Sequence, residues 1–309
     1  MDIALVGDKT YPQQWLPRLR ERLPEDRFFI YPDVDDPAQV RIALVGSPQE
    51  GELAALPNLQ LVQCLWMGVD RLLNDRSLPR DVPLARMVDP SMVNAMTEMV
   101  LAWVIDFHRS LHKYRQQQAQ GRWACIPQRI ASDRTVGILG LGELGRAAAQ
   151  ALNRLGFNVC GWSRTQKSIP GIACHSSRQG LDAVLRQSDV LVCLLPLTPA
   201  THGLLSRPVF ERMKRGAALI SLGRGAQMVT ADLLTALDSG QLEYAYLDVF
   251  EDEPLPENHV LWTHRQVSIT PHIAARTEVR TAVNVAVENI DRVRRGERPM
   301  YLVDLEAGY

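Results

Sequence analysis

The chain of 309 residues is long enough for about two domains with sizeable apolar cores. Apolar residues make up 46% of it and charged residues 22%, which is the composition of an ordinary globular protein and excludes a disordered or fibrous one. The 34 basic and 35 acidic residues almost cancel, so the charge indicates neither nucleic acid nor an anionic membrane as a partner.

The N-terminus and the apolar runs predict a cytoplasmic protein. Residues 1–6 have no basic segment of a signal peptide, and no apolar run approaches the roughly 18 residues of a membrane span. The five cysteines include no CxxC pair, and three of them lie in apolar, strand-like runs. We therefore expect reduced, mostly buried thiols and no metal site.

The first hundred residues alternate short apolar runs with helical stretches, which predicts a small open α/β domain with a parallel sheet. The expected strands are 3–6, 28–31, 42–45, 61–65 and 84–88.

A long helix is predicted next, with Asp89 as its cap, Pro90 in its first turn, and an end near Gln118. Its apolar face is unusually broad. Such a helix is either simply buried or part of a subunit interface, and the sequence leaves both possibilities open.

Residues 134–270 repeat the alternation of strands and helices, and an amphipathic helix over 278–295 is expected to return to the first domain. The expected strands are 135–139, 158–162, 190–195, 218–222, 244–247 and 267–269. The predicted fold class is therefore α/β, with two doubly wound parallel-sheet domains.

The strand at 135–139 leads into Gly140-x-Gly142-x-x-Gly145, and a helical stretch follows. This strand, turn and helix form the context of a dinucleotide site: Gly140 permits the turn, Gly142 lets the backbone approach a pyrophosphate, and Gly145 lets the helix pack on the strand. The alternative is a glycine-rich turn that binds no ligand.

The next strand, 158–162, ends without the acid that binds the ribose 2'-hydroxyl of NAD. Ser163, Arg164, Thr165 and Lys167 follow it instead, and their hydroxyls and cations suit the 2'-phosphate of NADP. The alternative is a solvated basic turn.

Three further segments come just after predicted strands, at the sheet edge where ligands of such folds bind. They carry Arg224, Glu253 and His272. Together they indicate a cation for a substrate carboxylate, a carboxylate that orients an imidazole, and an imidazole that exchanges a proton.

In order and spacing, the motifs of this chain resemble those of the D-isomer-specific 2-hydroxyacid dehydrogenases over nearly its whole length. They are Gly140-x-Gly142-x-x-Gly145, Leu195-Pro-Leu-Thr-Pro-x-Thr201, Met213-Lys-x-Gly216-Ala, Arg224-Gly225, Asp248-Val-Phe-x-x-Glu253-Pro-Leu-Pro and Thr270-Pro-His272. Trp162-Ser-Arg164-Thr165, the stretch 89–99 and the short tail are similar to bacterial glyoxylate and hydroxypyruvate reductases.

The resemblance implies a flavodoxin-like substrate domain (1–97 and 276–309), a Rossmann domain that binds NADP (98–275), and reduction of glyoxylate and hydroxypyruvate by NADPH. In the implied mechanism His272 protonates the keto oxygen, Glu253 keeps His272 charged and oriented, and Arg224 binds the carboxylate and polarises the carbonyl. It also implies a homodimer in which residues of about 96–132 cross to the partner, and a cleft that closes by hinging near residues 97 and 275.

The resemblance also assigns binding residues. The expected cofactor site comprises Gly140, Leu141, Gly142, Glu143, Leu144, Gly145, Ser163, Arg164, Thr165, Lys167, Pro196, Thr198, Thr201 and Asp248, of which Asp248 would contact the nicotinamide amide. The expected substrate site comprises Trp66, Met67, Gly68, Arg224 and His272.

The chain departs from the family at Ser221, where an Asn is usual, at Thr230, and at 96–99, which leaves the contacts around Arg224 and the nicotinamide open. Two other readings also stay open. One is the same chemistry on pyruvate or aryl pyruvates, and the other is a non-catalytic, dinucleotide-sensing binding protein.

Overall fold

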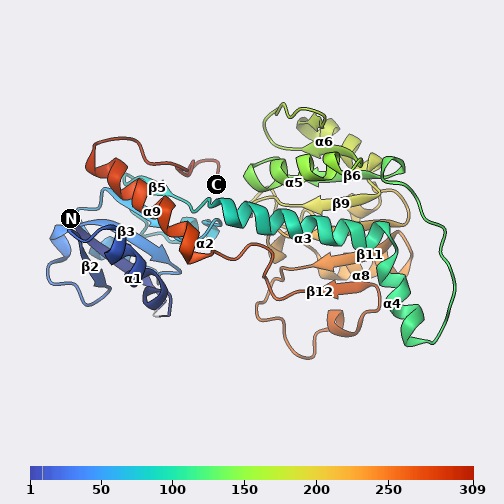
Figure 1. Ribbon diagram of the computed structural model, residues 1–309, viewed down its shortest axis with the longest axis horizontal. Coiled ribbons are helices and arrows are strands. Elements are labelled where there is room, and N and C mark those ends of the chain that lie inside the picture. The colour runs from blue at the N-terminus through green and yellow to red at the C-terminus, as the bar shows by residue number, and fades with distance from the viewer. Residues whose placement is uncertain (9) are drawn as a thin grey trace. The chain divides into compact units, whose positions relative to one another are not determined.

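The computed structural model describes residues 1–8 and 10–309, and it contains two compact α/β units. Unit 1 comprises Met1–Met92 and Thr277–Tyr309, and unit 2 comprises Val93–Arg276 (Figure 1). Each unit is built on one sheet whose strands pair in parallel, five strands in unit 1 and seven in unit 2. The expected fold class of two doubly wound parallel-sheet domains is confirmed.

The sheet of unit 1 has the order β2-β1-β3-β4-β5, the doubly wound order of flavodoxin-like folds. Its strands are β1 (Asp2–Gly7), β2 (Arg27–Ile30), β3 (Val40–Gly46), β4 (Leu61–Cys64) and β5 (Leu84–Ala85). The C-terminal tail pairs with β5 in the antiparallel sense, because Leu302 bridges Ala85 and the Val303 N–H donates to the Leu84 carbonyl at 2.8 Å.

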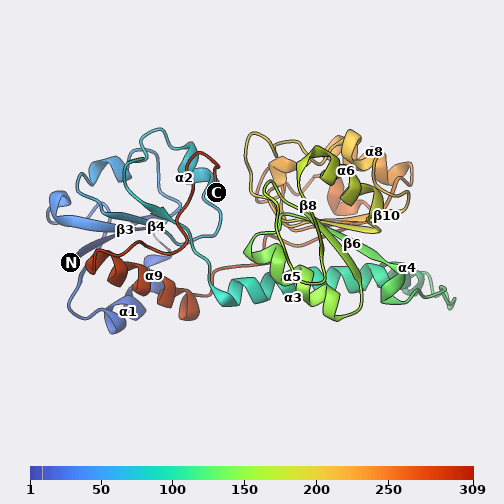
Figure 2. The ribbon, with the colours of Figure 1, turned by 90° about the horizontal axis from the view of Figure 1, so that it is seen from above.

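Two long helices, α1 (Pro12–Arg22) and α9 (Val279–Arg294), lie side by side on one face of this sheet (Figure 2). The other elements of unit 1 are short: α2 (Asp70–Asn74) and the 3-10 turns η1 (Pro37–Gln39) and η2 (Leu53–Ala55). The central strands β1 and β3 are apolar over most of their length and largely buried, as expected of parallel strands that are covered on both faces.

The sheet of unit 2 has the order β12-β11-β10-β9-β6-β7-β8. Its strands are β6 (Thr135–Leu139), β7 (Asn158–Trp162), β8 (Ala173–His175), β9 (Val190–Cys193), β10 (Ala217–Ser221), β11 (Leu242–Leu247) and β12 (Val267–Ile269). The strand order reverses between β6 and β9, which makes their carboxyl ends the switch point where dinucleotides bind in such sheets.

Helices cover both faces of this sheet (Figure 2): α3 and α5 on one, α6 and α8 on the other. Alternate residues of one strand supply the two cores, since Val136 and Ile138 of β6 pack with α3 and α5, whereas Leu139 packs with α6 and α8. The helical elements are α3 (Pro90–His108), α4 (Leu111–Ala119), α5 (Glu143–Arg154), α6 (Ser177–Gln187), α7 (Arg207–Phe210), α8 (Thr230–Asp238), η3 (Ala131–Asp133), η4 (Gly225–Gln227) and η5 (Val260–Thr263).

The prediction of one helix running from Pro90 to about Gln118 was wrong. The helix ends at His108, Ser110 takes a left-handed conformation with φ 57°, and α4 begins at Leu111. The carboxylate of Asp89 is bonded by the hydroxyls of Ser91 and Thr281. Strand β8 was not predicted from the sequence at all.

A polar cluster around the buried Asp106 side chain explains why the helix breaks. Arg115 donates from both terminal nitrogens to the Asp106 carboxylate, at 2.7 and 3.0 Å, although the two residues are nine positions apart. In a continuous helix that separation would place them on opposite sides, because each residue turns the helix by about 100°. The reversal at Ser110 lets Arg115 return to Asp106, and the Tyr246 hydroxyl of β11 donates to the same carboxylate at 2.6 Å.

We predict that Tyr246→Phe lowers the free energy of unfolding by about 1.5–3 kcal/mol, the usual range for a hydrogen bond to a charged group. Burial and the hydrogen bond to Asp106 raise the pKa of Tyr246, so its hydroxyl keeps the proton that it donates. Urea unfolding followed by circular dichroism measures the change. Tyr244→Phe is the matched control, because the Tyr244 hydroxyl pairs with the neutral Ser268 hydroxyl at 3.1 Å. Equal effects of the two variants would contradict the prediction.

Candidate active site

The turn between β6 and α5 has the backbone that a pyrophosphate requires. Gly140 has φ +100°, and Gly142 is the N-cap of α5 with no side chain capping the helix. A Cβ at Gly145 would lie 1.8 Å from the Gly140 carbonyl oxygen, so the helix can approach the turn this closely only with a glycine there. A Cβ at Gly142 would meet nothing within 4 Å, so the space over this N-terminus is open. These features fit a dinucleotide phosphate, which backbone N–H groups of such a turn bind.

The side chains of this turn divide between core and surface. Leu141 is buried against Gly161 of β7, where a Cβ would lie 2.5 Å from the Leu141 side chain. Glu143 is exposed in the first turn of α5, and Leu144 packs at the edge of the core.

The end of β7 presents the predicted basic turn. Arg164, Thr165 and Lys167 are exposed, whereas Ser163 is buried and its hydroxyl donates to the Thr165 carbonyl at 2.8 Å. Ser163 therefore shapes the turn, and the other three side chains lie on the surface.

The loop after β9 is braced by one threonine. The Thr201 hydroxyl donates to the Pro196 carbonyl at 2.7 Å and accepts from the Thr198 N–H at 2.8 Å. Since β9 is the direct neighbour of β6, this loop and the glycine turn leave adjacent strands at the same edge of the sheet.

His272 and Glu253 are brought together from segments that follow β12 and β11. The Nδ1 atom of His272 lies 2.7 Å from the Oε2 atom of Glu253, and the other oxygen of Glu253 accepts from the Phe250 N–H at 2.9 Å. The carboxylate is therefore fixed to the backbone and in turn orients the imidazole, which is half-exposed. The backbone of His272 has φ +52°, an uncommon conformation for a residue with a side chain.

Asp248 is buried just after β11, and its carboxylate is occupied by the turn that carries His272. It accepts from the Thr270 hydroxyl at 2.5 Å and from the N–H groups of Ile273 and Ala274, each at 2.9 Å. This role as the support of residues 270–274 was not predicted from the sequence, although Thr270 belongs to the quoted motif. The expected contact of Asp248 with the nicotinamide amide stays a prediction.

Arg224 follows β10, the strand between β9 and β11. Its Nη1 donates to the Gly223 carbonyl at 2.9 Å, and the next residue is packed tightly. A Cβ at Gly225 would lie 1.8 Å from the carbonyl carbon of Phe250, so the Arg224 turn touches the segment that holds Glu253. Thus Arg224, Glu253 and His272 lie in segments that follow the carboxyl ends of β10, β11 and β12, which are neighbouring strands of one sheet.

The predicted substrate residues 66–68 lie in unit 1, directly after β4. The Trp66 N–H meets the Cys64 sulfur at 3.4 Å, and the Trp66 carbonyl accepts from the Met87 N–H at 3.0 Å. In the part of the chain that the structure describes, the N–H groups of Met67 and Gly68 donate no hydrogen bond within the protein.

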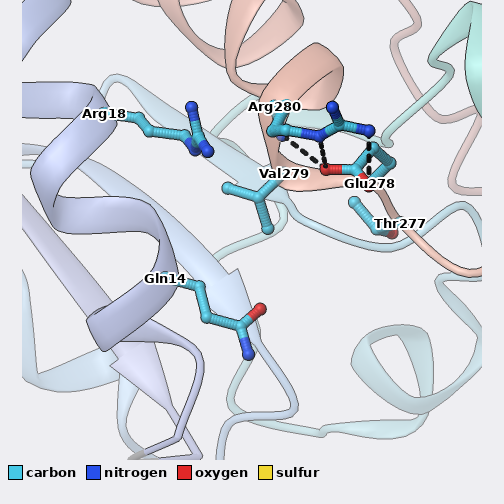
Figure 3. A pocket seen from close by; sticks show the side chains of 6 residues that line it. All are labelled: Gln14, Arg18, Thr277, Glu278, Val279 and Arg280. Carbon is cyan, nitrogen blue, oxygen red and sulfur yellow. Dashed lines mark hydrogen bonds and ion pairs between the residues drawn. The ribbon is translucent and has the colours of Figure 1, made fainter.

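Unit 1 also has a hollow between α1 and the start of α9 (Figure 3), lined by Gln14, Arg18, Thr277, Glu278, Val279 and Arg280. None of the predicted site residues lines it. The Glu278 carboxylate caps α9 by accepting from the Arg280 N–H at 3.0 Å.

None of the helices formed by residues 1–8 and 10–309 has both the length and the apolar character needed to cross a membrane.

Comparison with known proteins gives close and consistent relatives. Glyoxylate/hydroxypyruvate reductase A of Yersinia enterocolitica is 39% identical over 315 residues, with 100% of both chains covered. The crystal structure of a D-isomer specific 2-hydroxyacid dehydrogenase from Xanthobacter autotrophicus Py2, in complex with NADPH and MES, matches with a TM-score of 0.95 and 40% identity over 100% of this chain and 99% of that one.

A second solved structure is the NADPH-dependent glyoxylate/hydroxypyruvate reductase of Sinorhizobium meliloti in complex with NADP and sulfate. It matches with a TM-score of 0.93 and 35% identity over 100% of both chains. Residues 101–274 match the family model of the D-isomer specific 2-hydroxyacid dehydrogenase NAD binding domain. On the strength of these matches and of the site just described, this chain belongs to the D-isomer specific 2-hydroxyacid dehydrogenases.

Proposed function

We propose that this chain is an NADPH-dependent reductase of small 2-keto acids, which converts glyoxylate to glycolate and hydroxypyruvate to D-glycerate. The observation that carries the proposal is the 2.7 Å contact between His272 and Glu253 at the edge of a sheet whose glycine turn fits a dinucleotide. Full-length relatives that are named for this reduction support it.

The reaction adds a hydride and a proton to a keto group. The bound nicotinamide supplies the hydride to the keto carbon. His272 supplies the proton: because its Nδ1 faces the Glu253 carboxylate, Nε2 is the nitrogen that gives a proton to the keto oxygen. The Glu253 carboxylate holds the imidazole ring in place before and during the transfer.

Arg224 binds the carboxylate of the substrate, because a planar guanidinium can pair with both carboxylate oxygens and polarise the adjacent carbonyl. The N–H groups of Met67 and Gly68 are the second set of carboxylate donors in this proposal. Trp66 flanks them and is 38% exposed, which leaves its ring available to a ligand.

The cofactor residues that we propose are those of the three loops that follow β6, β7 and β9. The N–H groups of residues 142–145 hold the pyrophosphate, the loop with Pro196, Thr198 and Thr201 lies along the cofactor, and Arg164 with Lys167 binds the 2'-phosphate. The exposure of Arg164, Thr165 and Lys167 supports this assignment.

A cofactor absorbance assay tests the function. NADPH and NADH are offered in turn with glyoxylate, hydroxypyruvate, pyruvate and phenylpyruvate. We expect the highest kcat/KM for NADPH with glyoxylate or hydroxypyruvate. Preference for pyruvate or phenylpyruvate would assign a different substrate to the same chemistry, and NADPH binding without any turnover would favour a dinucleotide-sensing protein.

We predict that His272→Ala lowers kcat by about 100- to 10,000-fold, the usual contribution of general acid–base catalysis, while NADPH still binds. Steady-state kinetics and the fluorescence of bound NADPH measure the two effects. His175→Ala is the control, since His175 lies in β8, at the other edge of the sheet from β12. A turnover of His272→Ala near that of the wild type would remove the assignment.

We predict that Arg164→Ala raises the dissociation constant of NADPH by roughly 10- to 150-fold with little effect on that of NADH, because a charge-assisted hydrogen bond contributes about 1.5–3 kcal/mol. The double variant Ser163→Asp with Arg164→Ala should invert the cofactor preference, since a carboxylate repels the 2'-phosphate and accepts the ribose hydroxyl. Dissociation constants for both cofactors measure this. Equal use of NADH and NADPH by the wild type would mean that the basic turn is solvated.

We also propose that the chain is a homodimer joined through the α3–α4 region and the segment after it. This segment, 120–130, runs as a long loop at the edge of unit 2 (Figure 1), and its Trp123 is 99% exposed. Leu111 and Ile130 are exposed as well, at 42% and 67%. Exposed apolar side chains gathered in one segment are typical of a protein interface.

Sedimentation velocity tests the dimer. A buried Trp often contributes about 2 kcal/mol to an interface, and a twofold dimer loses it twice, so Trp123→Ser should raise the dimer dissociation constant by roughly a thousandfold. Trp262→Ser is the control, as Trp262 is 49% exposed elsewhere in unit 2. A monomeric wild type would contradict the proposal, and so would an unchanged Trp123→Ser.

A cytoplasmic location is the last part of the proposal. All five cysteines are free, and Cys125 is exposed, which suits a reducing compartment. Recovery of the native protein in a secreted fraction would contradict it.

A further inference from the structure

One fully buried side chain connects two of the loops at this sheet edge. Gln227 ends η4, just after Arg224, and its side-chain nitrogen donates to two carbonyls of the loop that follows β9, those of Leu195 and Pro196, each at 3.0 Å. Its side-chain oxygen accepts from the backbone N–H of Arg224 at 2.9 Å.

The orientation of this amide follows from its partners. Two carbonyl oxygens can only accept, so the Gln227 nitrogen must face them, and an N–H can only donate, so the oxygen must face Arg224. Turning the amide over would place oxygen against oxygen and nitrogen against N–H. The amide is also tightly packed, because a Cβ at Gly223 would lie 2.3 Å from the Gln227 oxygen.

The bonds therefore set the distance between a cofactor loop and the backbone of the substrate arginine. The Pro196 carbonyl that Gln227 binds is also the one that the Thr201 hydroxyl binds, so both ends of the 196–201 loop depend on it. On the other side, the Arg224 N–H belongs to the third residue after the end of β10.

We propose that Gln227 is a positioning residue for the reaction, which holds the 196–201 cofactor loop and Arg224 in register through one buried amide. This proposal rests on the proposed function in its substrate half, because the role of Arg224 belongs to that function. Its cofactor half is independent of the substrate. Gln227 is fully buried, so in this proposal it acts without contacting either ligand.

The test compares Gln227→Met with Gln241→Met. Gln241 is a matched control, since its side-chain nitrogen also donates to two backbone carbonyls, those of Phe210 and Met213 at 2.8 and 3.0 Å. It directly precedes β11 and so lies at the amino end of that strand, away from the loops of the candidate site. Both variants should lower the melting temperature. Only Gln227→Met should raise the dissociation constant of NADP and the KM for glyoxylate, each by about tenfold, the equivalent of one net hydrogen bond.

A second variant keeps the test valid if Gln227→Met fails to fold. Gln227→Glu preserves the acceptor for the Arg224 N–H, and its neutral acid can still donate to one carbonyl, whereas its ionised form faces two carbonyl oxygens. NADP affinity of this variant should therefore fall as the pH rises from 6 to 9, beyond any change in the wild type or in Gln241→Glu. The nearby Cys193 thiol does not confuse this window, because burial raises its pKa to about 11.

The outcomes separate the two proposals. If the wild type binds NADP but reduces none of the keto acids, the proposed function fails, and the NADP dissociation constants alone decide the role of Gln227. A fall in melting temperature with unchanged NADP affinity and unchanged KM overturns the positioning role, as does a pH profile of Gln227→Glu that matches Gln241→Glu. A wild type that binds no NADP overturns both.

Discussion

The buried carboxylate of Asp248 is the interaction on which the candidate site depends. Burying a charge costs several kcal/mol unless hydrogen bonds compensate for it, and here the compensation comes from Thr270, Ile273 and Ala274. The turn that bears His272 is therefore tied to the end of β11. Glu253 comes from the same strand end, since its carboxylate is bound by the Phe250 N–H. Both members of the imidazole–carboxylate pair thus take their positions from one strand.

The rest of the site follows from the order of strands in the sheet of unit 2. Because every strand runs the same way, the segments after β6, β7, β9, β10, β11 and β12 all emerge at one edge. Close backbone contacts then fix neighbouring loops to one another, as at Gly145 against Gly140 and at Gly225 against Phe250. A site of this kind is held mainly by backbone groups, which have few alternative conformations.

Much of this could be predicted from the sequence. Strands such as β1, β3 and β6 are runs of apolar residues long enough to be recognised, and the expected proximity of Glu253 to His272 followed from their places after two strands. Strand β8 was missed because its three residues, Ala173–His175, carry no apolar pattern. The long strands were recognised and β8 was missed for the same reason: a sequence pattern reveals a strand only where the strand's own residues form an apolar run.

The remaining features depend on contacts between distant residues. The break at Ser110 serves the pairing of Asp106 with Arg115 and Tyr246, and nothing in residues 105–115 alone disfavours a continuous helix. The bonds of Asp248 to Ile273 and Ala274, and those of Gln227 to Leu195 and Pro196, are likewise contacts between residues far apart in the sequence. Ser163 was expected to meet a phosphate, yet its hydroxyl is used within its own turn.

The left-handed backbone of His272 carries a consequence for the evolution and engineering of this fold. Glycine and asparagine adopt φ near +52° more readily than histidine, so the chain keeps at this place a residue that is not the most stable choice. Selection for stability alone would drift away from histidine here, and only selection for chemistry would hold it. Variant libraries that are screened for heat resistance should therefore be screened for turnover as well, because stability and catalysis favour different residues at position 272.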